Sequence, residues 1–157
     1  MTAAGYSQKP GPFAKFGGKW YGNGEIHLAN GTKEVIKCSG DFVTVDMGSV
    51  ANLKINLKCA NPGYRFDLQS DLNTNGSEVT GTWTELSHGV NGKVLGRIKD
   101  DQISATAEGQ TFTAALEIKN FGDKQHITLS SPGSEIANVL IGLLRSGVKP
   151  TTPPQTQ

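Results

Sequence analysis

The strongest constraint on the fold is a regular alternation of apolar and polar residues that first appears in the segment 18–28. Trp20, Ile26 and Leu28 share one parity there, and the residues between them are mostly polar or charged. Because successive side chains of a strand point to opposite faces, this pattern predicts a β-strand with one buried face. Similar segments follow until about Arg145, so we expect an all-β protein.

Short turn signals separate these predicted strands. Asn-Gly pairs at 30–31 and 75–76 and a Pro-Gly pair at 62–63 stand between alternating runs, and such pairs are typical of tight hairpin turns. Small residues recur on the expected inner faces, which favours a closed barrel over a two-sheet sandwich, the alternative. These small residues are Gly81, Gly92, Gly96, Ala105, Ala107 and Ala114. We predict a single antiparallel up-and-down β-barrel of about eight to ten strands.

The chain of 157 residues is short enough for one domain. We expect a barrel domain at 13–145 between two disordered tails at 1–12 and 146–157, because both ends are rich in Pro and Gly or lack apolar residues. Residues 13–16 read Phe-Ala-Lys-Phe. One helical turn there would place two aromatic rings against a mouth of the barrel.

Two segments contain residues that interrupt or complicate the strand pattern. Gly40 interrupts the second predicted strand and indicates a bulge or a sharp bend. The apolar residues of 136–144 fit a helix as well as a strand. A barrel needs a last strand beside the first to remove its open edges, so we predict a short helical turn at 133–137 followed by a strand at 138–145.

The two cysteines, Cys38 and Cys59, both fall on the inward parity of neighbouring predicted strands. Two inward thiols on adjacent strands can form a disulfide if the register brings them together. Two buried free thiols are the alternative. A disulfide indicates an oxidising compartment.

Charge and hydropathy exclude two classes of partner. The formal net charge is +1 and the 15 basic residues are scattered, so we expect no binding of nucleic acid. No apolar run reaches the roughly 18 residues of a membrane-spanning helix. The first four residues have no hydrophobic targeting region behind them, which indicates either a cytosolic protein or a mature exported form with an added Met.

Glu85 is the most informative polar residue. Its parity places it on the inner face beside Trp83, and a buried carboxylate without a partner is costly. We therefore expect it near a barrel mouth, paired with a base such as Arg145, exposed to solvent, or in contact with a ligand. The candidate ligand-binding residues are Glu85, Trp83, Tyr64, Phe66 and Gln125, all on the predicted inner face.

No pattern indicates catalysis or a metal. His27 and His126 fall on outward parities and His88 falls in a turn, without partners at metal-ligand spacing. We expect surface histidines, and His88 is the best candidate if a haem ligand exists at a barrel mouth. No second inward carboxylate or nucleophile turn is evident. We expect no enzyme activity, no metal and no cofactor.

The Gly18-x-Trp20 motif after a short aromatic turn, together with Arg145 on the last strand, resembles the lipocalins and the wider calycin group. The resemblance implies that Trp20 closes one end of the barrel and that Arg145 packs across its ring, as structural residues. A guanidinium group over an indole is a favourable cation–π contact. The Thr-Asp-Tyr motif and the long helix that follow in that family are missing from this sequence.

A broader pattern is similar to a group of small, uncharacterised secreted bacterial proteins. It comprises 18–24, Cys38, 57–60, 64–66 and 81–85, and the resemblance covers most of residues 16 to 145. It implies export to the periplasm or the medium and a barrel, without an activity. The Trp followed by a linked Cys pair also resembles secreted bacterial protease inhibitors built on a small eight-stranded barrel.

Two functions remain in view from the sequence. The first is a secreted or periplasmic non-catalytic binding protein, monomeric, with a small hydrophobic molecule in the barrel. The second is a protein-interaction barrel, such as a protease inhibitor. It would act through exposed loops at 46–51 or 120–124, or through the tail at 1–12.

Overall fold

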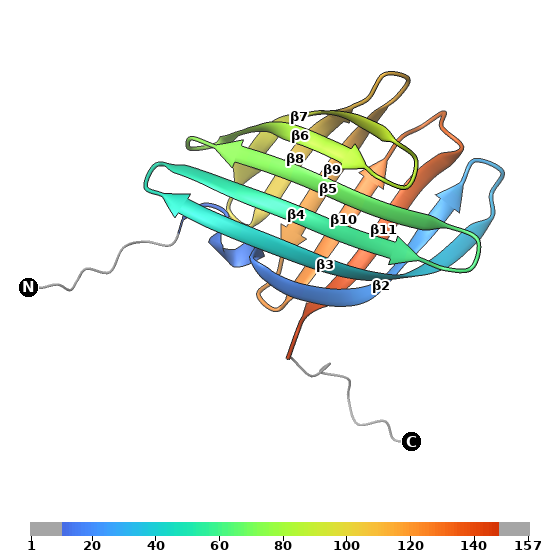
Figure 1. Ribbon diagram of the computed structural model, residues 1–157, viewed down its shortest axis with the longest axis horizontal. Helices are drawn as coiled ribbons and strands as arrows, with labels where there is room; N and C mark the ends of the chain where they lie inside the picture. The colour runs from blue at the N-terminus through green and yellow to red at the C-terminus, as the bar shows by residue number, and fades with distance from the viewer. Residues whose placement is uncertain (1–10, 148–157) are drawn as a thin grey trace, which may run out of the picture.

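Ten β-strands follow a short 3₁₀ helix along residues 11–147, the part of the chain that the computed structural model describes (Figure 1). The elements are η1 (Ala14–Phe16), β2 (Gly18–Leu28), β3 (Lys33–Met47), β4 (Val50–Ala60), β5 (Arg65–Thr74), β6 (Glu78–Glu85), β7 (Val90–Lys99), β8 (Gln102–Glu108), β9 (Thr113–Asn120), β10 (Lys124–Ser130) and β11 (Ile136–Arg145). The tails predicted at 1–12 and 146–157 lie almost entirely outside the described residues.

Every strand pairs antiparallel with its neighbours in sequence, and β11 pairs with β2. The sheet is therefore a closed up-and-down barrel without a free pair of edge strands. This confirms the predicted fold class and rules out the two-sheet sandwich. Among the described residues, no helix is both long and apolar enough to cross a membrane.

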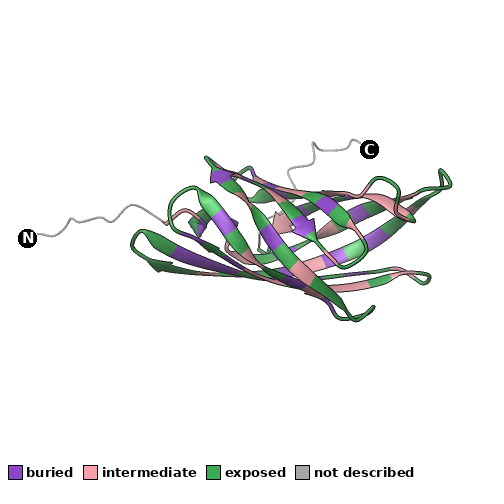
Figure 2. Cartoon of the chain, turned by 90° about the horizontal axis from the view of Figure 1, so that it is seen from above, coloured by how far each residue is buried: buried purple, intermediate pink, exposed green. Residues whose placement is uncertain are grey.

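The two ends of the barrel differ. At one end, here called the η1 end, lie η1 and the turns that follow the odd-numbered strands from β3 to β9. The opposite end, here called the distal end, carries the turns β2–β3, β4–β5, β6–β7, β8–β9 and β10–β11. Buried and exposed residues alternate along the strands, as the sequence pattern predicts (Figure 2).

Large side chains fill the barrel at the η1 end. Trp20 and Phe16 are fully buried, and Phe13 and Phe42 are nearly so, which confirms that the 13–16 turn packs its two aromatic rings inward. Toward the middle and the distal end, apolar residues packed on this core remain partly exposed. They are Leu28, Tyr64, Phe66, Leu68, Ala105, Phe112, Leu116, Leu129 and Ile136.

Gly40 makes no bulge, contrary to the prediction. The register runs unbroken through it, with Trp20 opposite on β2 and Leu57 opposite on β4. A Cβ atom at this position would lie 3.0 Å from Cε1 of Phe42. The glycine thus leaves room for an inward aromatic ring, and the strand stays regular.

The predicted helical turn at 133–137 is also wrong. Pro132 and Gly133 form a turn, and β11 begins at Ile136, which pairs with Leu28. The register shift between Ile136 and Asn138 is the one irregularity of the β2–β11 ladder. The helical spacing of this segment is overridden because its backbone groups complete the ladder that closes the barrel.

Close backbone approaches explain two glycines on the inner parity. A Cβ atom at Gly22 would lie 1.9 Å from the carbonyl oxygen of Gly142, and one at Gly92 would lie 1.6 Å from that of Glu108. Any other residue would force these strand pairs apart. The glycines therefore allow the sharp bending of the wall that closes a barrel of small residues.

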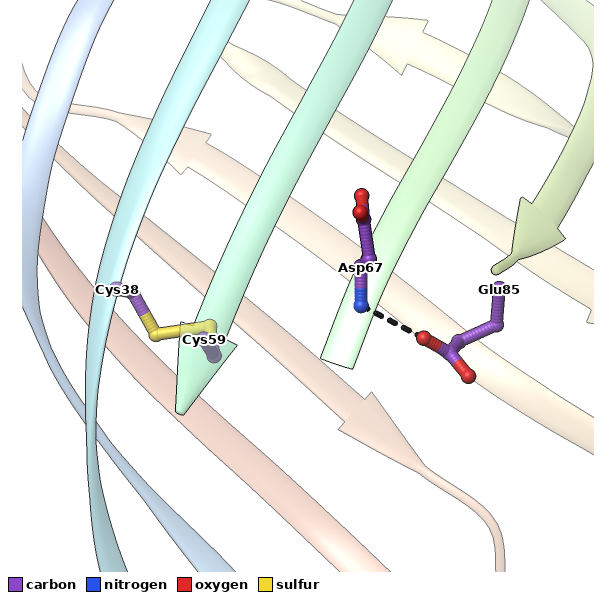
Figure 3. The surroundings of a disulfide bond; sticks show 4 residues. All are labelled: Cys38, Cys59, Asp67 and Glu85. Atoms are coloured by element: carbon purple, nitrogen blue, oxygen red, sulfur yellow. Dashed lines mark hydrogen bonds between the residues drawn. A yellow bond between two sulfur atoms is a disulfide. The ribbon is translucent and has the colours of Figure 1, made fainter. Parts of the chain in front are cut away.

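Cys38 and Cys59 form a disulfide between β3 and β4 (Figure 3). The two residues lie directly opposite each other in the register, with their Cα atoms 4.1 Å apart, and both are buried on the inner face. This confirms the disulfide and rules out two free thiols.

We expect the double substitution Cys38→Ala and Cys59→Ala to lower the free energy of unfolding by about 3 kcal/mol, because the disulfide closes a separation of 21 residues. Urea unfolding of both proteins measures the difference. The wild-type protein under reducing conditions should lose a similar amount. Equal midpoints for oxidised and reduced protein would contradict a stabilising bridge.

Candidate functional site

Four of the five predicted ligand-binding residues lie toward the distal end. Glu85 and Trp83 lie at the end of β6, Phe66 lies at the start of β5, and Tyr64 immediately precedes β5. Leu68 pairs with Glu85 across the β5–β6 ladder. The predicted inward face of β6 is observed, since Trp83 and Glu85 are both buried.

The Glu85 carboxylate is held by a set of hydrogen bonds at this end. Its Oε2 atom accepts from the backbone N–H of Asp67 at 2.6 Å and of Ser87 at 3.2 Å. Its Oε1 atom accepts from the backbone N–H of His88 at 2.8 Å and also bonds Nδ1 of the His88 ring. Figure 3 shows the side chain reaching from β6 to the backbone of β5. Although Glu85 is only 7% exposed, both of its oxygen atoms are satisfied.

Burial alone would raise the pKa of Glu85, because it disfavours the charged form. The hydrogen bond from the backbone of Asp67, followed by those from the His88 ring and the backbone of Ser87, outweighs this effect and lowers the pKa below its usual value. Glu85 is therefore ionised at neutral pH. Its partner is His88, and the pairing with Arg145 considered from the sequence is wrong, because Arg145 lies at the η1 end.

The sequence analysis names His88 as a surface residue and as the best candidate for a haem ligand at a barrel mouth, but it misses the pairing with Glu85. The His88 side chain is 59% exposed. The available signal was its spacing of three residues after an inward carboxylate, which lets a tight turn fold the ring back onto that group. The expectation of no second inward carboxylate is wrong, because the partly buried Glu34 pairs with the inward Ile26 and accepts a hydrogen bond from Asn61 at 3.2 Å.

Aromatic rings form two pairs at the distal end. The Phe66 and His88 rings lie 5.9 Å apart, and the Trp83 and Phe112 rings lie 5.6 Å apart, measured between centroids. The indole N–H of Trp83 donates to the carbonyl oxygen of Glu108 at 3.1 Å, which fixes the ring. This end thus combines oriented aromatic rings, partly exposed apolar residues and one buried carboxylate.

Gln125 does not belong to this group. It lies at the start of β10, at the η1 end, where it is fully buried and its Oε1 atom accepts a hydrogen bond from Asn120 at 3.0 Å. Its inward parity was predicted correctly. Parity, however, predicts only the face of the strand on which a residue lies, and not the end of the barrel at which it lies.

Trp20 and Arg145 close the η1 end. They are opposite each other in the β2–β11 register, and the guanidinium carbon lies 4.3 Å from the centroid of the Trp20 ring. The indole N–H donates to the carbonyl oxygen of Phe16 at 3.0 Å. The guanidinium group donates to the carbonyl oxygens of Lys15, Gly17 and Gly122 and to the Asp123 carboxylate. The contact implied by the lipocalin resemblance is therefore present.

Two surface depressions lie on the outside of the barrel wall. One, of about 450 Å³, lies over β2, β3, β10 and β11, with Val35 and His126 among its lining residues. The other, of about 470 Å³, lies over β3 to β6 and is lined mainly by polar residues such as Asn56 and Gln69. Neither includes a predicted site residue. In the described part of the chain, no group of three or more His, Cys, Asp or Glu residues could hold a metal ion.

We expect Glu85→Gln to destabilise the protein at neutral pH by about 1–3 kcal/mol, because the amide leaves backbone donors without an acceptor. Since folding lowers the pKa of Glu85, the stabilisation is present above the usual carboxyl pKa and is lost as the pH falls through the lower folded value. The gap between the two proteins in urea unfolding should therefore narrow in acid.

Glu78→Gln is the matched control, because Glu78 is an exposed carboxylate at the other end of the same strand. It should leave the unfolding midpoint within error at every pH. A Glu85→Gln gap that stays constant down to strongly acidic pH would contradict the role assigned to the charge.

No family model and no curated protein matches this sequence. Solved structures do match the fold. Rv2717c from M. tuberculosis superposes with a TM-score of 0.67 at 13% identity, covering 85% of this chain and 94% of that one. The S-type phycobiliprotein lyase CPES from Guillardia theta superposes with a TM-score of 0.61 at 10% identity, covering 87% and 92%. At these identities the likeness concerns the fold alone, and that fold is a lipocalin-like, calycin-type barrel.

Proposed function

We propose that this protein is a non-catalytic binding protein that takes a small, largely apolar molecule at the distal end of its barrel. The observation that carries the proposal is the asymmetry of the inner face. Bulky rings fill the η1 end, whereas apolar inner residues such as Phe66, Leu116 and Leu129 remain partly exposed toward the distal end. Apolar walls with a few oriented polar groups are typical of small-molecule sites.

The chemistry of Glu85 supports binding over catalysis. A general acid needs a pKa near the working pH, whereas hydrogen bonds lower the pKa of Glu85 and occupy both of its oxygen atoms. One structural neighbour is by its title a phycobiliprotein lyase. We assign no lyase activity to this chain, because the two proteins share a fold at 10% identity and nothing more specific.

The disulfide supports a location outside the cytosol. Disulfides persist in the periplasm and in secreted proteins and are rare in the reducing cytosol, and Cys38 and Cys59 are joined here. We therefore propose that the protein works as a secreted or periplasmic monomer.

Tryptophan fluorescence tests the ligand proposal, because the two tryptophans lie at opposite ends. We expect a panel of fatty acids, long-chain alcohols, sterols and haem to include a molecule that changes the emission of Trp20→Phe saturably, since that variant reports on Trp83 alone. The Trp83→Phe variant should not respond. No response from any member of the panel would contradict the proposal.

A blocking substitution gives a matched control for the same experiment. Ala105→Phe adds a ring to the partly exposed inner wall of β8 and should abolish binding, whereas Leu95→Phe adds one to the outer face of the adjacent β7 and should not. Equal affinity of the two variants would show that the ligand binds elsewhere.

A second candidate function is a protein-interaction barrel that acts through the β3–β4 hairpin. Val43, Val45, Met47 and Val50 are all 40% or more exposed there, within and beside the 46–51 loop that the sequence singled out. Exposed apolar clusters of this kind are typical of protein contacts.

For this second function we expect inhibition of at least one member of a panel of secreted proteases. The substitution Met47→Lys should relieve the inhibition without lowering the unfolding midpoint, because Met47 is 57% exposed. Full protease activity throughout the panel would rule out the inhibitor.

A further inference from the structure

The Glu85–His88 pair joins a buried carboxylate to a largely exposed imidazole at the distal end. Glu85 takes hydrogen bonds from three backbone N–H groups and from the ring of His88. A carboxylate held in this way fixes the turn at 86–89, and it also fixes the orientation of the imidazole.

The pairing determines which ring nitrogen carries the proton. Because the ionised Glu85 can only accept hydrogen bonds, the Nδ1 atom that faces it must be a donor. In the neutral imidazole, Nε2 then carries the lone pair and acts as an acceptor. Among the described residues nothing bonds to Nε2 of His88, and the His88 side chain is 59% exposed.

The ring lies beside the apolar inner residues. Its centroid is 5.9 Å from that of Phe66, which belongs to the partly exposed apolar set. A hydrogen-bond acceptor thus lies on a ring that stacks near Phe66, and a polar group beside an apolar one can bind one end of an amphipathic molecule.

We propose that His88 is the polar anchor of the ligand site and that its Nε2 atom accepts a hydrogen bond from a hydroxyl group at the end of an otherwise apolar molecule. This inference rests on the proposed function and names the ligand class. His88 thereby distinguishes a long-chain alcohol from the carboxylic acid of the same chain length and from the methyl ester of that acid.

Charge explains why a hydroxyl group fits better than a carboxylate. Glu85 forms no ion pair with a lysine or arginine in the described part of the chain, so its negative charge is stabilised only by hydrogen bonds from three backbone N–H groups and from Nδ1 of His88. A ligand carboxylate beside His88 would add a second negative charge, which is unfavourable. A free metal ion is a poorer fit to Nε2, because no further potential ligands gather around it within the described residues.

The test compares lauryl alcohol, laurate and methyl laurate, which share one alkyl chain and differ in the head group. Displacement of a fluorescent fatty probe from the wild-type protein, at one mildly alkaline pH for all three molecules, gives the three affinities. We expect lauryl alcohol to bind about fivefold more tightly than methyl laurate, the usual worth of one hydrogen bond, and laurate to bind more weakly than the alcohol.

Substitutions at position 88 separate anchoring from packing. His88→Phe keeps a ring beside Phe66 and should remove the preference for the alcohol, while His88→Gln, whose amide oxygen is an acceptor, should retain part of it. The backbone N–H of residue 88 still donates to Glu85 in both variants, so we expect both to fold. His126→Phe, on the outer wall, is the control and should leave the preference unchanged.

The outcomes distinguish the two levels of the proposal. Equal binding of alcohol and ester by the wild-type protein, or a preference that survives His88→Phe, would overturn the anchor role and leave the binding function standing. Absence of binding for all three molecules, together with no change of tryptophan emission for any member of the wider panel, would overturn both the anchor role and the binding function.

Discussion

Closure of the barrel depends on the pairing of its first strand with its last. Arg145 lies across the ring of Trp20, and its guanidinium group reaches the backbone on both sides of the junction, at Gly17 and at Gly122. A cation–π contact is worth about 1 kcal/mol, but the hydrogen bonds to carbonyl oxygens also satisfy backbone groups at the end of the barrel. Without this junction, β2 and β11 would both be open edges.

Sealing one end determines where a ligand could bind. Trp20, Phe13 and Phe16 are buried in the interior at the η1 end, where the buried Gln125 and Asn120 also bond each other. Several apolar inner residues of the distal end are only partly buried. The polar groups of the distal end are organised by Glu85, and they surround partly exposed apolar side chains.

The sequence predicted the architecture because alternation and turn chemistry are local properties. The parity of Trp20, Trp83, Cys38 and Cys59 was enough to place all four on the inner face, and the shared register then allowed the disulfide. Local pattern failed where a distant partner decides the conformation. The 133–137 segment has helical spacing, but Ile136 just inside it pairs with β2. Gly40 alone indicates a bulge, whereas in the structure it leaves room for the ring of Phe42.

The candidate site was harder to predict for the same reason. Parity selected Glu85, Trp83, Tyr64 and Phe66, which lie at the distal end, and it also selected Gln125, which lies at the opposite end. The contact between His88 and Glu85 was not predicted, because the alternation that assigns strand residues to a face does not apply to a residue in a turn. The orientation of His88 depends on a carboxylate three residues earlier and on the backbone of β5 across the ladder, neither of which a pattern of apolar residues reveals.

The junction of Arg145 also has a consequence for the order of folding. Arg145 and Gly17, which it bonds, are 128 residues apart in the sequence, whereas the two cysteines are separated by 21. Contacts between distant residues carry the larger loop-closure entropy and form slowly. Oxidation of the β3–β4 hairpin can therefore precede completion of the barrel, and a chain that emerges from its N-terminus first cannot close until its last strand is present.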